Sequence, residues 1–416
     1  MGHASSCVQR LLRPALVGVA AVLGAGLITA PAGALIPNDP GWRDAWGSRL
    51  VRLPAVWDLS VGSSDVVIAT IDTGAYPVPD LADALVPGRD MIENDAIPRD
   101  EQGHGTAVAT IIAARGDNGT GLAGVCWKCH LMPIRVAAKT EAPPSLIAAA
   151  IRWAVDHGAR IVNVSLTGGG LPDPLEADAV AYAVQHDVLV VASAGNTGAE
   201  APDYPAALPG VIAVAGTDPS DVLYPWSTRG SWVRLAAPGC QVVGAIPTGW
   251  GTLCGSSVAP AVVAGIAGLM LSLDPSLTAE DLAVALESSA VPVDGIAGGR
   301  VDAYGALVAA GLAHAQPLEP YTRQVEVETG LLSRRIDIPL LLGEGAFRAQ
   351  LTSTLARLCT LTLFGGDTAI TASPSGKNTV VLQTLAPEGR YVLTVECDAL
   401  QPKPYELSIT AMFATR

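Results

Sequence analysis

Nearly continuous apolar runs alternate with segments rich in small residues over residues 35–314. The apolar runs predict strands over 66–72, 130–136, 160–166, 188–194, 211–215 and 242–246. The segments between them predict helices over 106–114, 145–157, 174–186 and 257–273. Strands that are apolar almost throughout and separated by helices are typical of a parallel sheet covered on both faces. We therefore predict an α/β fold with a mostly parallel sheet and helices on both sides.

The pattern changes after Ala315. Residues 316–320 read Gln-Pro-Leu-Glu-Pro, which indicates a linker over 315–322. Beyond the linker, shorter alternating runs separated by turns predict strands over 335–341, 347–354, 360–364, 379–382, 391–396 and 406–412. We expect residues 323–416 to form a small all-β sandwich, separate from an α/β domain over 35–314.

The first 34 residues have the pattern of an export signal. Arg10 and Arg13 precede an uncharged apolar run that starts at Pro14, and residues 32–34 read Ala-Gly-Ala. Small residues of this kind mark a cleavage site, so we expect cleavage after Ala34 and a secreted, extracellular protein. The apolar run is also long enough for an uncleaved membrane anchor, and that alternative stays open.

Composition excludes one class of partner. Half of the 416 residues are apolar and the net charge is −14, with no run of Lys or Arg. Binding to a nucleic-acid backbone needs a basic surface, so we expect no nucleic-acid partner. An acidic surface favours solubility.

Six cysteines remain after the predicted cleavage, which is an even number in an exported chain. They allow 15 pairings, of which we favour the local one: 126–129, 240–254 and 359–397. The segment Cys126-Trp127-Lys128-Cys129-His130 also fits the pattern for covalent haem attachment, for thiol redox chemistry or for part of a zinc site. No haem-sized helical fold, thioredoxin-like unit or further pair of zinc ligands accompanies it, so we expect a structural disulfide and no haem.

Four polar residues stand in settings that suit acyl transfer. Asp72 ends a predicted strand, His104 lies between two glycines, Asn196 follows a strand between glycines, and Ser257 lies at a predicted helix start. Taken alone, each has an ordinary explanation: a turn residue, a solvated histidine, a left-handed turn or a helix cap. The other histidines of the mature chain lack such a setting, and we interpret them as structural: His130, His157, His186 and His314.

In the order Asp, His, Ser, with the Asn between, these segments resemble the subtilisin-like serine proteases (subtilases) over about residues 36–312. The family pattern around the nucleophile is Gly-Thr-Ser-Met-Ala-x-Pro-His-Val-Ala-Gly. Six of its eleven positions match when Ser257 is the nucleophile, and three match when Ser256 is. The departures are Ser256, Val258, Pro260, Ala261 and Val262.

The resemblance implies a secreted serine endopeptidase that needs no cofactor for its chemistry. Ser257 would be the nucleophile, His104 the general base and Asp72 the group that orients the base. Asn196 and the backbone N–H of Ser257 would bind the oxyanion. The alternative is a binding protein that keeps the fold without catalysis, which the altered segment after Ser257 favours.

The resemblance also implies how polypeptide substrates bind. They would lie extended against a strand edge, with contacts from Ser165, Leu166, Thr167, Gly168 and Gly195. The pocket wall over 192–197 carries no acidic side chain, so we expect apolar or small residues before the scissile bond.

A structural calcium ion is a further implication, held by Asp80 and Asn118 with Asp39 as a weaker third ligand. The alternative is that these are ordinary turn residues. The C-terminal region resembles the β-sandwich (pre-peptidase C-terminal) modules of secreted bacterial proteases, most closely over 389–395. It would either stabilise the enzyme or contact a substrate or surface, and we expect a monomer.

Overall fold

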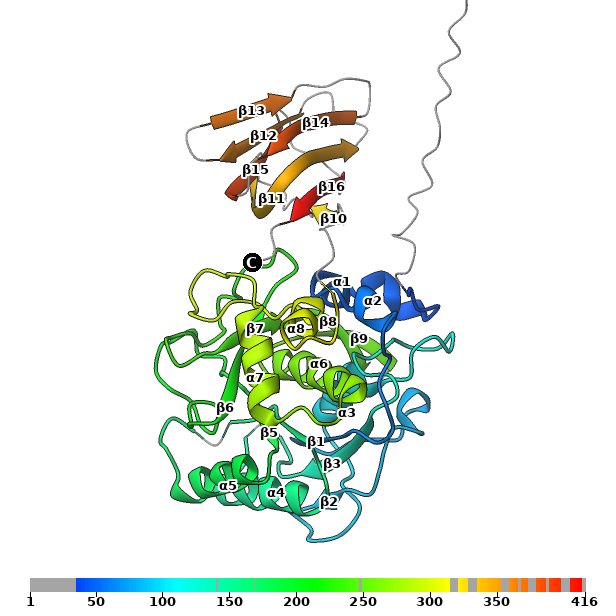
Figure 1. Ribbon diagram of the computed structural model, residues 1–416, viewed down its shortest axis with the longest axis vertical. Coiled ribbons are helices and arrows are strands. Elements are labelled where there is room, and N and C mark those ends of the chain that lie inside the picture. Colours follow the sequence, from blue (N-terminus) through cyan, green and yellow to red (C-terminus); the bar gives the residue numbers. More distant parts are fainter. Residues whose placement is uncertain are drawn as a thin grey trace, which may run out of the picture.

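The structure is a computed structural model that describes residues 35–139, 141–167, 169–246 and 249–314, together with the backbone of the C-terminal strands (Figure 1). The predicted export signal, residues 1–34, lies outside the described residues. Within the part that is described, no helix is both long and apolar enough to cross a membrane.

A seven-stranded sheet forms the centre of the first region (Figure 1). Its order is β2-β3-β1-β4-β5-β6-β7, and every neighbouring pair is parallel. The strands are β1 (Val67–Asp72), β2 (Arg89–Asp90), β3 (His130–Arg135), β4 (Ile161–Val164), β5 (Leu189–Ser193), β6 (Val211–Thr217) and β7 (Leu235–Pro238). The predicted α/β fold with a parallel sheet is confirmed.

Helices cover both faces of this sheet. Successive strand residues point to opposite sides, so the apolar strands present side chains to a core on each face. Ile68 packs with one core cluster and its neighbour Ala69 with the other. The first cluster includes α3 (His104–Ala113), α6 (Ala259–Leu273), α7 (Ala279–Ser288) and α8 (Ala303–Ala309). The second includes α4 (Pro144–Asp156) and α5 (Pro174–Gln185). Helix α6 is apolar on all sides and is almost entirely buried, as expected for a central helix.

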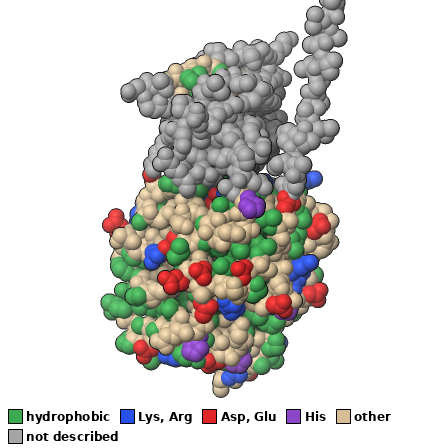
Figure 2. Space-filling view, viewed as in Figure 1, with side chains coloured by type: hydrophobic (Ala, Val, Ile, Leu, Met, Phe, Trp, Pro, Cys, Tyr) green, Lys and Arg blue, Asp and Glu red, His purple; other side chains and the backbone are tan. Residues whose placement is uncertain are grey.

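Short elements complete this region near its N-terminal end: η1 (Pro40–Asp44), α1 (Trp46–Leu50), α2 (Leu53–Trp57) and η2 (Pro79–Leu81). On the face shown in Figure 2, acidic and basic side chains are interspersed. The net charge of −14 is therefore not gathered into a single acidic face there.

The sequence pattern was wrong about one strand of the main sheet. The predicted strand over 242–246 belongs to β8 (Cys240–Ile246), which pairs antiparallel with β9 (Gly249–Cys254) in a separate hairpin. The edge strand next to β6 in the main sheet is instead β7, whose four residues are all buried. Its sequence, Leu-Ala-Ala-Pro, carries a weak strand signal, because β propensity favours β-branched and aromatic side chains and disfavours Ala and Pro.

The C-terminal region forms an antiparallel sheet (Figure 1). Its strands are β10 (Tyr321–Val327), β11 (Arg335–Thr352), β12 (Cys359–Gly365), β13 (Thr368–Ala372), β14 (Thr379–Ala386), β15 (Gly389–Cys397) and β16 (Tyr405–Phe413). Two predicted strands are halves of β11, which has a register shift between Leu342 and Phe347. Strand β10 begins at Tyr321, within the range predicted for the linker. The domain boundaries and the packing as a sandwich stay predictions.

Candidate active site

The carboxyl end of β1 and the start of α3 bring Asp72 and His104 together. Asp72 is the last residue of β1 and is fully buried, while His104 is the first residue of α3, two residues earlier than the predicted helix start. A Cβ at Gly105 would lie 2.1 Å from the carbonyl oxygen of Gly74, so only glycine allows this approach. The close approach sets the imidazole against the end of the strand.

Three side chains form a continuous hydrogen-bonded chain. His104 Nδ1 lies 2.8 Å from Asp72 Oδ1, and His104 Nε2 lies 2.9 Å from Ser257 Oγ. Asp72 Oδ1 also accepts a hydrogen bond from the backbone N–H of Thr73 at 2.7 Å. A carboxylate only accepts, so His104 donates through Nδ1 and presents the lone pair of Nε2 to the serine hydroxyl. That is the arrangement in which a serine can lose its proton to a base.

The charge around His104 favours its protonated form. Burial lowers the pKa of His104, but the facing Asp72 carboxylate and the negative charge of Asp100 more than offset this effect. The pKa of His104 therefore lies above the ordinary value of 6.5.

Ser257, and not Ser256, faces the base. Ser257 lies in the turn before α6, which begins at Ala259, so it does not act as the helix cap. Ser256 is buried, and its Oγ accepts a hydrogen bond from the backbone N–H of Gly195 at 3.1 Å. Pro260 occupies the first turn of α6, where a missing N–H costs no helical hydrogen bond.

Asn196 lies next to Ser257. Its Oδ1 accepts a hydrogen bond from the backbone N–H of Ser256 at 2.7 Å, which fixes the amide group. A Cβ at Gly255 would lie 3.2 Å from Ser257 Oγ and 3.8 Å from Asn196 Nδ2. Gly255 therefore borders a space that the serine hydroxyl and the amide both reach.

Asp100 is a site residue that the sequence analysis missed. Its two carboxylate oxygens accept five hydrogen bonds, from the hydroxyl of Thr73, the backbone N–H groups of Gln102 and Gly103, and both the N–H and the hydroxyl of Thr106. These bonds tie the loop before His104 to the segment after Asp72. The feature of the sequence that could have pointed to Asp100 is its place as an acidic residue shortly before Gly-His-Gly.

The predicted substrate edge follows β4. The Ser165 hydroxyl accepts a hydrogen bond from Asn163 Nδ2 at 2.9 Å, and Leu166 is buried. Both side chains are thus engaged in the protein interior. Thr167 forms an isolated bridge with Glu141, and Gly168 lies outside the described residues.

The three predicted calcium ligands lie around one loop, 117–122. Asp80 Oδ1 accepts a hydrogen bond from Asn118 Nδ2 at 2.8 Å, and Asp39 Oδ2 accepts one from the backbone N–H of Asp117 at 2.6 Å. Burial raises the pKa of Asp80, two hydrogen bonds lower it, and the negative charge of Asp39 raises it further. Two buried carboxylates that repel each other suit a hard cation. Gly121 lies against one of them, since a Cβ at Gly121 would lie 2.2 Å from Asp80 Oδ2.

Asn118 fits the ion less well, because it turns its amide nitrogen and not its oxygen toward Asp80. Among the described residues, no group of three or more His, Cys, Asp or Glu side chains is placed to hold a metal.

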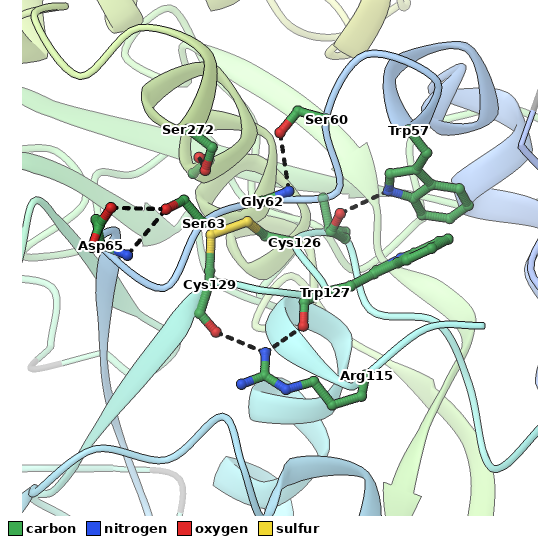
Figure 3. The surroundings of a disulfide bond; sticks show 12 residues. Trp57, Ser60, Gly62, Ser63, Asp65, Arg115, Cys126, Trp127, Cys129 and Ser272 are labelled. Atoms are coloured by element: carbon green, nitrogen blue, oxygen red, sulfur yellow. Dashed lines mark hydrogen bonds between the residues drawn. A yellow bond between two sulfur atoms is a disulfide. The ribbon is translucent and has the colours of Figure 1, made fainter. Parts of the chain in front are cut away.

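Two of the favoured disulfides are confirmed, Cys126–Cys129 and Cys240–Cys254. Figure 3 shows the first of them, where Arg115 donates to the carbonyl oxygens of Trp127 and Cys129. The Trp57 and Trp127 rings lie beside it with their centroids 4.7 Å apart. Both sulfur atoms of the Cys-Trp-Lys-Cys-His motif are thus used in a structural crosslink. In the C-terminal sheet, Cys359 and Cys397 are register partners, while their disulfide stays a prediction.

Comparison with known proteins decides the family. The model of the subtilase family matches residues 63–320, well over half of the chain. The chain belongs to the subtilase family. This subtilase is 39% identical over 279 residues to thermitase of Thermoactinomyces vulgaris. The matched region covers 65% of this chain and 99% of thermitase. It is 38% identical over 284 residues to halolysin of Haloferax mediterranei, covering 65% of the chain and 54% of halolysin.

Among solved structures, a protease from Pseudoalteromonas arctica superposes with a TM-score of 0.63 at 30% identity, over 66% of this subtilase and 99% of that chain. Together with the triad geometry, these matches identify a serine-type endopeptidase that acts on polypeptides. Enzymes of this family need no cofactor for the chemical step.

Proposed function

We propose that Ser257, His104 and Asp72 carry out peptide hydrolysis through an acyl-enzyme. Ser257 Oγ attacks the scissile carbonyl carbon while its proton passes to His104 Nε2. The C–N bond then breaks, and His104 returns the proton to the leaving amine. Water repeats the sequence on the ester and releases the acid. Asp72 holds the imidazole in the required tautomer and stabilises its cation. The observation that carries this proposal is the chain of 2.8 and 2.9 Å contacts through His104.

In this proposal Asn196 and the backbone N–H of Ser257 stabilise the tetrahedral oxyanion. The fixed Asn196 amide beside Ser257 Oγ supports this role, because a preorganised donor costs no reorganisation in the transition state. Removal of one such donor costs about 10²–10³-fold in kcat. The extended substrate pairs with the backbone of residues 165–170, and Gly195 gives it room beside Asn196.

Covalent labelling tests the nucleophile. Mature enzyme is incubated with a fluorophosphonate probe, and the modified residue is found by mass spectrometry. We expect the label on Ser257, its loss in Ser257→Ala and its retention in the matched variant Ser256→Ala. A label on Ser256, or no label on folded protein, contradicts the proposal.

We also infer that the subtilase is exported and loses residues 1–34. The Arg10 and Arg13 region, the apolar run and the Ala-Gly-Ala site support export, and the two disulfides suit an oxidising compartment. N-terminal sequencing of protein from the culture medium should begin at Leu35. Cell-associated protein that keeps residues 1–34 would point to a membrane anchor instead.

A structural calcium ion near loop 117–122 is part of this proposal. Asp39 and Asp80 would hold it together with carbonyl oxygens of the loop, and Asn118 would contribute its oxygen after its amide turns over. The ion would remove the repulsion between the two buried carboxylates. We expect EDTA to lower the melting temperature of the wild type but not that of Asp80→Asn, with calcium titration calorimetry as a direct check.

A further inference from the structure

Three acidic side chains lie near one another, and none of them has a counterion among the described residues. Asp173 and Glu176 lie at the start of α5, and Asp203 lies in the loop after Asn196. Glu176 is fully buried, and neither of its carboxylate oxygens has a hydrogen-bond partner in the part of the chain that the structure describes. Burial, together with the negative charges of Asp173 and Asp203, raises the pKa of Glu176 to about 7. A buried carboxyl without partners is costly, so this one calls for an explanation.

Asp203 borders the residue that precedes Asn196. A Cβ at Gly195 would lie 2.6 Å from Asp203 Oδ2 and 2.9 Å from Thr228 Oγ1. Gly195 also has a φ of +100°, a backbone conformation that is a second reason for glycine at this position. The Asp203 carboxylate therefore packs directly against Gly195, the residue before Asn196, in the position that a side chain would need.

The backbone around Asp203 also reaches the predicted substrate edge. Tyr204 donates its N–H to the carbonyl of Gly169 at 3.1 Å, which forms an antiparallel bridge. The edge segment follows β4 and the Asn196 segment follows β5, and these two strands are parallel neighbours. The segment that begins at Asp203 thus closes the space between the carboxyl ends of β4 and β5.

A bound substrate would direct one side chain into this space. Its scissile carbonyl carbon faces Ser257 and its backbone pairs with residues 165–170. The side chain of the residue before the scissile bond (P1) then points between the two segments, toward Asp203. Asp203 Oδ1 accepts a hydrogen bond from its own neighbour Tyr204, while Oδ2 accepts none from the described residues. None of the ion pairs in the described part of the chain includes Asp173, Glu176 or Asp203.

We propose that Asp203, with Glu176 beside it, forms an acidic floor to the P1 pocket and that this subtilase cleaves preferentially after Lys or Arg. A P1 ammonium or guanidinium group would pair with carboxylates that otherwise lack a cation, whereas an apolar side chain would leave them unpaired. This inference replaces the expectation of an apolar or small P1 residue. The earlier expectation considered only the wall over 192–197 and did not include Asp203. The inference rests on the proposed function, because it places the P1 residue by the triad and the substrate edge.

The test compares kcat/KM for peptides that differ only at P1, with Lys, Arg, Met, Phe or Ala. We expect the wild type to favour Lys and Arg by at least about tenfold. Asp203→Asn keeps the acceptor for Tyr204 N–H but loses the charge, and should lower kcat/KM for Lys and Arg by about 10- to 100-fold. Its values for Met and Phe should stay within about twofold. Glu176→Gln should reduce the same preference by a smaller factor.

Asp178→Asn is the matched control, because it removes one charge from the exposed side of the same helix. It should leave the P1 profile unchanged. Fluorophosphonate labelling of every variant separates the two proposals. A labelled wild type without a basic preference overturns this inference alone, and so does an Asp203→Asn variant that loses the same factor on all five peptides. Absence of label on the wild type overturns the proposed function itself.

Discussion

Two acidic groups flank the catalytic serine, and their surroundings differ. On the His104 side, Asp100 is fully buried and accepts five hydrogen bonds, while Asp72 holds the imidazole. On the Asn196 side, Glu176 is equally buried, yet from the described residues its carboxyl oxygens accept no hydrogen bond and the Asp203 carboxylate accepts one. Buried carboxylates are stabilised by donors. Asp100 and the Oδ1 atom of Asp72 therefore have their partners within the protein, whereas Asp72 Oδ2 has none in the described part of the chain. The second pair is left for a cation that arrives with the substrate.

The largest expected effect on kcat comes from a change at Asp72. In Asp72→Asn an amide replaces the carboxylate, so it favours the wrong imidazole tautomer and no longer stabilises the imidazolium. We expect kcat to fall by about 10⁴-fold for every substrate. Steady-state kinetics with Asp178→Asn as the control measures this fall. A loss below about 100-fold would mean that Asp72 does not orient the base.

Asp100→Asn is the next largest change. The new amide group can accept through only one atom and directs two N–H donors toward existing donors. We expect a loss of about 1–3 kcal/mol in the free energy of unfolding and a fall of about 10- to 100-fold in kcat/KM. The fall should be equal for all P1 residues, unlike that of Asp203→Asn. A P1-selective loss in Asp100→Asn would remove the distinction between the two acidic groups.

The pH profile of kcat/KM tests the charge around His104. Attack needs neutral His104, and the pKa of His104 is raised above 6.5. The acid limb of kcat/KM should therefore have its midpoint above pH 6.5, with activity lost as pH falls through it. Because Asp100 contributes to the raised pKa, Asp100→Asn should move the midpoint to lower pH. A wild-type midpoint at or below pH 6.5 would contradict this reading of the electrostatics.

The smallest expected effect is that of Glu176→Gln on the free energy of unfolding. The pKa of Glu176 is about 7 in the folded protein against 4.5 for the ordinary group, so the folded state holds the proton more tightly. Its contribution to stability is fully present below pH 4.5 and is lost as pH rises toward 7. Glu176→Gln should therefore gain stability relative to the wild type between pH 4.5 and 8. Denaturant unfolding at several pH values measures it, and a constant difference would show that Glu176 titrates normally.

Local sequence predicted the features that depend on neighbouring residues. Asp72 at a strand end, His104 between glycines and Ser257 before an apolar helix each have a local signal, and their order indicated the family. Cys126–Cys129 and Cys240–Cys254 were predictable as well, because short loops keep these cysteines close together. The apolar strands fixed the parallel sheet, since only a sheet covered on both faces buries such runs.

The tertiary structure decided the features that depend on packing between distant segments. The role of Asp100 became visible only in the fold, which places Thr73 and Thr106 around its carboxylate. Asp203 follows Asn196 by only a few residues, but its position beside Gly195 depends on how the loop returns to Gly169. Glu176 lies in the first turn of a predicted helix, and only the fold shows that its carboxyl group is buried. Burial and electrostatic environment are properties of the space around a side chain, and the residues that create that space are not its neighbours in the sequence.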